Sequence, residues 1–389
     1  MKKFRQAFRP EQIFHQHRLV VFAVAFVFAV GVGAPFEDHA RAGTSPAATN
    51  PTTAVLTYST EAGSTNSTGV GRAYSTERGS AHSTGFSRAY SIEARNLPNA
   101  DKKSDSIEAR NLPNADKKLD GESRFAKLDL SAGQKPARVH YVNYGKGKEA
   151  LVLIHGWTMN VDNWRDQISD FARRSRVIAI DLPGHGQSDK PQTTYSMDLF
   201  ARAVDAVMRD AKVKRAVLVG HSMGTPVVRQ FYRKYPEKTL AIVIVDGALR
   251  PFGDKAMMDR MVAGFRSPDY QKTATQMFAA MSGPNLSADA QERIKASFLN
   301  TPQYVVVGAM EGMADTSIWG EDKINLPVLA IMAKNPFYPP NLEVRYRAIA
   351  PNMDFHMWDG VGHFVMMEKP KEFNEAVLAF LDKNNLLKR

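Results

Sequence analysis

The chain has 389 residues, of which 43% are hydrophobic, and it carries a formal net charge of +11 and no cysteine. The missing cysteines exclude disulfide bonds, thiolate metal sites and a cysteine nucleophile. The positive charge is scattered, and no basic run alternates with aromatic residues, which disfavours nucleic-acid recognition and leaves a small molecule as the expected partner. The sequence leaves the oligomeric state open.

Residues 1–42 have the pattern of a secretory signal peptide. Lysines and arginines gather in residues 1–18, residues 19–34 carry no charge, and a small-x-small pattern ends at Ala42. This order predicts cleavage after Ala42 and a secreted or periplasmic protein without stable membrane insertion. An uncleaved signal that anchors the protein is the alternative, although the apolar run is shorter than the about 20 residues that a membrane span requires.

Residues 43–122 are predicted to form a disordered linker that contains repeats. YSTEAGSTNSTGVGRA at 58–73 recurs as YSTERGSAHSTGFSRA at 74–89, and SIEARNLPNADKK stands unchanged at both 91–103 and 106–118. These repeats hold few large apolar side chains, so they cannot bury enough surface to offset the entropy lost on ordering. We expect no chemistry from this segment.

Residues 123–389 are predicted to form the folded domain, because strand and helix patterns alternate along them. Short apolar or β-branched runs predict strands at 138–144, 150–154, 176–180, 216–220, 241–245, 327–331 and 353–358. Helical periodicity predicts helices at 161–174, 196–210, after residue 222, and at 372–384. The alternation predicts an α/β fold with a mostly parallel sheet and helices on both faces.

A long interval interrupts this alternation between two of the predicted strands. Residues 248–325 show helical patterns and are rich in methionine and phenylalanine. We expect a helical cap over the carboxyl edge of the sheet. Most of these side chains should form the core of the cap, and the others should line an apolar pocket, because methionine adapts to irregular shapes.

The sequence GHSMG at 220–224 joins a predicted strand to a predicted helix. Glycines on both sides of the central three residues suit a very sharp turn, in which larger side chains would collide across the bend. Such a turn exposes Ser222 at the carboxyl edge of the sheet and at a helix N-terminus. Ser222 is therefore the predicted nucleophile, and it requires a neighbouring base.

From about residue 138 onward the chain resembles the α/β-hydrolase superfamily, specifically its capped esterases, lactonases and dehalogenase-like members. The motifs that carry this resemblance stand in the family's order: HGW (155–157), DLPGHGQSD (181–189), GHSMG (220–224), VDGA (245–248) and GVGHF (360–364). The resemblance implies an α/β-hydrolase fold with a cap inserted after the sixth strand.

The resemblance also implies the partners of Ser222. His363, in a loop after the last predicted strand, is the expected base. The oxyanion donors are expected to be the backbone N–H groups of Met223 and Trp157. The other histidines are expected to be structural or to lie outside the catalytic machinery: His15, His17, His39, His82, His140, His155, His185, His221 and His356.

The acid is the position at which the sequence departs from the commonest family pattern. Many relatives carry the carboxylate in a turn after the seventh strand, where this chain has AKNPFYPP at 333–340. Asp246, at the end of the sixth strand, is the expected acid, and a dyad without an acid is the alternative. Asp359 is disfavoured because it lies in the turn just before His363.

A serine at the turn favours acyl chemistry over the alkyl transfer of dehalogenases and epoxide hydrolases, which use an aspartate there. We therefore expect a carboxylic ester hydrolase for a small to medium apolar substrate. Lactone hydrolysis, carbon–carbon bond hydrolysis and perhydrolysis could use the same residues. A ligand-binding protein with little turnover is the non-enzymatic alternative. No motif suggests a metal or an organic cofactor, and none is expected.

Overall fold

The computed structural model describes residues 120–387 with the exception of residues 252 and 337. The predicted signal peptide at 1–42 and the repeats of the predicted linker lie outside the described residues. Within the part of the chain that the structure describes, no helix combines the length and apolar character that crossing a membrane requires.

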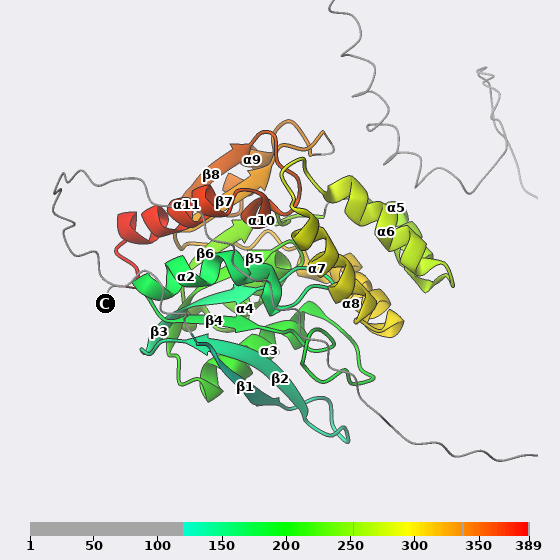
Figure 1. Ribbon diagram of the computed structural model, residues 1–389, viewed down its shortest axis with the longest axis horizontal. Helices are drawn as coiled ribbons and strands as arrows, with labels where there is room; N and C mark the ends of the chain where they lie inside the picture. The colour runs from blue at the N-terminus through cyan, green and yellow to red at the C-terminus, as the bar shows by residue number, and fades with distance from the viewer. Residues whose placement is uncertain (1–119, 252, 337, 388–389) are drawn as a thin grey trace, which may run out of the picture. The chain divides into compact units, whose positions relative to one another are not determined.

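A single mixed sheet of eight strands forms the centre of the described chain, in the order β1-β2-β4-β3-β5-β6-β7-β8 (Figure 1). The strands from β4 onward in this order run parallel, whereas β2 is antiparallel to both of its neighbours. Their bounds are β1 Glu122–Leu128, β2 Ala137–Tyr144, β3 Glu149–Ile154, β4 Val177–Ile180, β5 Arg215–His221, β6 Thr239–Val245, β7 Val328–Ala333 and β8 Met353–Trp358. The mostly parallel α/β fold expected from the sequence is confirmed.

The edge strand β1 had no counterpart among the strands that the sequence predicts, and it begins one residue before the predicted start of the folded domain. Only two of its seven residues, Ala126 and Leu128, are buried. Because β1 is paired on one side alone and three of its five exposed residues are charged, it lacks the continuous apolar run that identifies the central strands.

Helices cover both faces of the sheet. One face packs against α2 (Arg165–Arg174), α10 (Val365–Glu368) and α11 (Pro370–Lys383). The other packs against α3 (Met197–Asp210), α4 (Gly224–Lys234) and α9 (Leu342–Arg347). In α3, the apolar face predicted from the sequence is buried as expected: Leu199, Phe200, Ala203, Val204, Val207 and Met208.

Four helices occupy the interval between β6 and β7, and Figure 1 shows them grouped on one side of the core. They are α5 (Lys255–Arg266), α6 (Tyr270–Met281), α7 (Ala288–Leu299) and α8 (Gln303–Ala314). We refer to them together as the inserted helices. Hydrogen bonds connect them to the loop after β3: Trp157 Nε1 donates to the Val306 carbonyl at 2.9 Å, and Ser297 Oγ donates to the Thr158 carbonyl at 2.9 Å.

Candidate active site

Ser222 stands between β5 and α4 in a conformation that few residues other than glycine adopt. Its φ angle is +51°, which places it in the left-handed region and stores strain in the turn. The flanking glycines are sterically required. A Cβ on Gly220 would lie 2.5 Å from the Gly224 carbonyl oxygen, and one on Gly224 would lie 2.5 Å from the Ile154 carbonyl oxygen.

Asp246 and His363 form a hydrogen-bonded pair at the carboxyl edge of the sheet. Nδ1 of His363 lies 2.6 Å from Oδ2 of Asp246. The Asp246 side chain is 2% exposed and the His363 side chain is 15% exposed. Asp246 directly follows β6, and His363 lies in the loop after β8, so the pair joins elements 117 residues apart.

The second carboxylate oxygen of Asp246 accepts two further hydrogen bonds. Its Oδ1 atom accepts from the Ala333 backbone N–H at 2.8 Å and from the Tyr338 hydroxyl at 3.2 Å. Burial, together with the nearby charge of Asp246, raises the pKa of Tyr338 well above its usual value, so this phenol remains a donor. Tyr338 is not among the site residues that the sequence predicts. Its only signal was its place in the turn where many relatives carry the acid.

Asp359, the disfavoured alternative acid, makes different contacts. It forms an ion pair with Lys334 at 2.8 Å, and its side chain is 79% exposed. Its other oxygen accepts from the Gly360 N–H at 2.9 Å. The hydrogen bond from His363 therefore goes to the carboxylate at the end of β6.

The loop after β3 approaches the Ser222 turn closely. A Cβ on Gly156 would lie 3.1 Å from the Ser222 Cβ, a tight contact that a glycine avoids. Among the described residues, the backbone N–H groups of Met223 and Trp157 have no hydrogen-bond partner. His155 fixes this loop, because its Nδ1 donates to the Gly156 carbonyl and its Nε2 accepts from Leu182 N–H.

His221 and Glu368 hold the backbone on either side of His363. His221 Nε2 donates to the His363 carbonyl at 3.0 Å. Burial, with a contribution from the His363 charge, lowers the pKa of His221 well below its usual value, so this imidazole is neutral. Glu368 Oε1 accepts from Gly362 N–H at 2.9 Å and from Gly283 N–H at 3.1 Å, which connects the His363 loop to the inserted helices.

The inserted helices make one more direct contact with this loop, since His363 N–H donates to the Met281 carbonyl at 2.8 Å. Burial raises the pKa of Glu368 despite the two hydrogen bonds that it accepts. Its second oxygen, Oε2, is buried without a hydrogen-bond partner among the described residues. The position of His363 is therefore coupled to α6 through both backbone and side-chain contacts.

Ser222 and His363 line the same narrow cavity of about 20 Å³, which has room for about one water molecule. Its remaining lining is mostly apolar and comes from the loop after β3, from α6 and from the His363 loop: Gly156, Trp157, Met159, His221, Met277, Phe278, Met281 and Phe364. No lysine or arginine is among these lining residues. A substrate larger than a water molecule requires some of these lining side chains to move.

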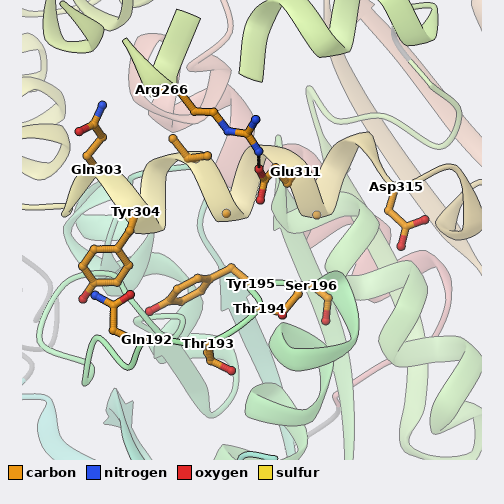
Figure 2. Close-up of a pocket in the computed structure, with 13 residues that line it drawn as sticks. Gln192, Thr193, Thr194, Tyr195, Ser196, Arg266, Gln303, Tyr304, Glu311 and Asp315 are labelled. Atoms are coloured by element: carbon orange, nitrogen blue, oxygen red, sulfur yellow. Dashed lines mark hydrogen bonds and ion pairs between the residues drawn. The ribbon is translucent and has the colours of Figure 1, made fainter. Parts of the chain in front are cut away.

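A larger pocket of about 550 Å³ lies elsewhere, between residues 192–196 and α8 (Figure 2). Its walls carry mostly hydroxyl, amide and charged side chains, and Arg266 forms an ion pair with Glu311 on the α8 side. Neither Ser222 nor His363 lines it. The smaller cavity is therefore the candidate active site, because it alone contains the strained serine and the histidine.

Comparison with known proteins identifies the family. A family model described as "alpha/beta hydrolase fold" matches residues 149–370, and the chain belongs to this family. A similar curated relative is a 2-hydroxy-6-oxononadienedioate/2-hydroxy-6-oxononatrienedioate hydrolase of Paraburkholderia phymatum. It is 28% identical over 282 residues, which cover 65% of this chain and 94% of the relative.

Solved structures show the same fold. A bromoperoxidase from Bacillus anthracis has a TM-score of 0.60 and 23% identity, with 67% of this chain and 100% of that one covered. Est816, described as an N-acyl homoserine lactone degrading enzyme, has a TM-score of 0.56 and 26% identity, with 65% of this chain and 99% of that one covered. Members of the fold therefore carry out several reactions, and the function of this chain has to be inferred from the residues of its site.

Proposed function

We propose that the protein is a serine hydrolase that cleaves carboxylic esters through an acyl-enzyme intermediate. One observation carries the proposal: a strained serine and a histidine line one apolar cavity, and that histidine is hydrogen-bonded to a buried aspartate. This arrangement supplies a nucleophile, a base and a group that orients the base, which acyl transfer requires.

In the proposed mechanism, Ser222 Oγ attacks the ester carbonyl carbon while His363 Nε2 accepts the hydroxyl proton. Asp246 holds the other ring nitrogen of His363 protonated, which leaves Nε2 free to act as the base, and it stabilises the imidazolium that forms. The N–H groups of Met223 and Trp157 stabilise the oxyanion. His363 then protonates the departing alcohol, and water releases the acyl group by the same steps in reverse.

The cavity lining supports an uncharged substrate. The Paraburkholderia relative is named for a dioate, a substrate with two carboxylates. Placing carboxylates among Trp157, Met277 and Phe278 without a cationic partner would cost several kcal/mol. The lining therefore favours a neutral ester over a dicarboxylate, and ester cleavage over the carbon–carbon cleavage of such diacids.

A lactone is the second candidate substrate, because it is also a neutral ester and the similarity to Est816 supports it. The same residues would open the ring, and the leaving alcohol would remain attached to the product.

The test measures kcat/KM of the purified protein against p-nitrophenyl esters and acyl-homoserine lactones of matched acyl length, with 2-hydroxy-6-oxononadienedioate, the dienedioate named for the relative, as the third substrate. Turnover of neutral esters or lactones, abolished in Ser222→Ala, is the expected result. Turnover of the dienedioate alone would overturn the ester assignment. Absence of any turnover or burst would favour the ligand-binding alternative.

A further inference from the structure

A second group of serine, histidine and aspartate lies at the start of the folded chain. Ser123 Oγ of β1 is 2.9 Å from Nε2 of His140 in β2. On the other side of the same ring, His140 Nδ1 is 2.7 Å from Oδ2 of Asp181, at the end of β4. Ser123 is exposed, whereas His140 and Asp181 are 0% and 1% exposed. The order of contacts is that of a nucleophile, a base and an orienting acid.

The hydrogen bonds fix which atom of His140 carries the proton. Asp181 also accepts from the backbone N–H groups of Val161 at 2.8 Å and Gln187 at 2.9 Å. Although burial alone would raise the pKa of Asp181, the hydrogen bonds from His140 and from these backbone groups lower it below its usual value. Asp181 is therefore ionised and accepts from His140 Nδ1–H, which leaves a lone pair on Nε2 facing the Ser123 hydroxyl.

The surroundings hold His140 in this orientation. Its backbone N–H donates to Ser188 Oγ at 2.8 Å, and Ser188 in turn donates to the Asp181 carbonyl. The Phe125 ring, two residues from Ser123 on the same face of β1, has its centroid 5.2 Å from the imidazole centroid. A base with a locked ring loses little entropy when it accepts a proton.

This cluster is separate from the proposed active site. Strand β1 is the edge of the sheet, and β2, β4 and β3 lie between it and β5, which leads to Ser222. None of Ser123, His140 and Asp181 lines the cavity that holds Ser222 and His363. The proposed mechanism uses none of them.

We propose that Ser123 is a second, independent nucleophile that accepts an acyl group from an activated aryl ester. The Ser123 Oγ forms a bond to the acyl carbon, and the bond between that carbon and the aryl oxygen breaks. The hydroxyl proton passes to His140 Nε2 and then to the departing aryl oxide, so that acyl-serine and a phenol are the products. Asp181 keeps His140 in the reactive tautomer throughout.

The expected reactivity lies between that of Ser222 and that of an ordinary serine. Ser123 stands in a regular strand and not at a strained turn before a helix, so its reaction lacks the turn's preorganisation. Assistance by a positioned base contributes about 10²–10⁴-fold. We expect acylation of Ser123 to be about 10²-fold faster than that of the exposed Ser131, which makes no side-chain contact with a histidine among the described residues.

The test uses the full chain carrying Ser222→Ala, treated with excess p-nitrophenyl acetate and then digested for peptide mass mapping. The expected result is acetylation of Ser123 far above that of Ser131 in the same molecule. When Ser123→Ala is added to the Ser222→Ala chain, the acetyl label on this segment should disappear. Equal labelling of the two serines would overturn the proposal.

Two further measurements separate activation by His140 from a local sequence effect. In the His140→Gln chain, a fold retained by circular dichroism should be accompanied by loss of Ser123 labelling. In the urea-unfolded Ser222→Ala chain, the preference for Ser123 over Ser131 should disappear. Persistence of the preference in either would overturn the proposal, and the urea measurement decides if His140→Gln does not fold.

Discussion

Replacement of Asp246 by asparagine tests the acid of the proposed active site. The asparagine side chain has the same shape, but only one of its two terminal atoms accepts hydrogen bonds. Two donors, Ala333 N–H and the Tyr338 hydroxyl, point at the Oδ1 position, so the amide oxygen should settle there. The amide NH₂ then faces His363 Nδ1 and donates to it. His363 must carry its proton on Nε2, where it can no longer accept one from Ser222.

The size of the effect follows from the geometry of the pair. The carboxylate oxygen lies 2.6 Å from the ring nitrogen, and the two charge centres are roughly 4 Å apart when the imidazolium forms. At an effective dielectric constant of about 20, this separation corresponds to about 4 kcal/mol, or roughly a 10³-fold loss of kcat. The tautomer change adds to the loss, so we expect roughly 10³–10⁴.

The assay measures kcat for a p-nitrophenyl ester, with the melting temperature and near-ultraviolet circular dichroism as checks of folding. Asp359→Asn is the matched control, because it changes an exposed carboxylate four residues from His363, and its kcat should stay close to wild type. A folded Asp246→Asn enzyme with a kcat within about fivefold of wild type would refute the reasoning. An equal loss in both variants would do the same.

Three further outcomes follow from the site. A fluorophosphonate at stoichiometric amounts should label Ser222, and Ser222→Ala should abolish ester turnover without lowering Tm; undiminished turnover would exclude this nucleophile. Phe278→Ala should enlarge the cavity and raise kcat/KM for hexanoate relative to acetate esters by about tenfold, whereas Gln276→Ala on the exposed face of α6 should leave the ratio unchanged. Because the pKa of Glu368 is raised, the folded state binds the Glu368 proton more tightly than the unfolded chain does. Protonated Glu368 therefore stabilises the fold below the ordinary carboxyl pKa of 4.5, and this stabilisation is lost as the pH rises. The Tm of Glu368→Gln relative to wild type should therefore increase between about pH 4 and about pH 7, and a pH-independent difference would contradict the assigned pKa.

The sequence by itself determined the central fold. Parallel strands buried on both faces must be apolar along their whole length, so runs such as residues 241–245 stand out without any knowledge of their neighbours. The Ser222 turn was equally visible, because its strain demands glycines at fixed positions. Strand β1 was missed because an edge strand buries only part of one face and leaves no such pattern.

Only the tertiary structure decided which side chains meet. The pairing of Asp246 with His363, the hydrogen bond from Tyr338 and the contact of Ser123 with His140 each join residues from different strands or loops. Asp246 and Asp359 are chemically identical carboxylates, and the sequence favoured Asp246 only through its position at the end of a predicted strand. Their roles differ because one follows the sixth strand at the buried edge of the sheet and the other lies in an exposed turn beside Lys334. Local sequence specifies strands and turns, whereas the order of strands in the sheet determines which strand ends become neighbours.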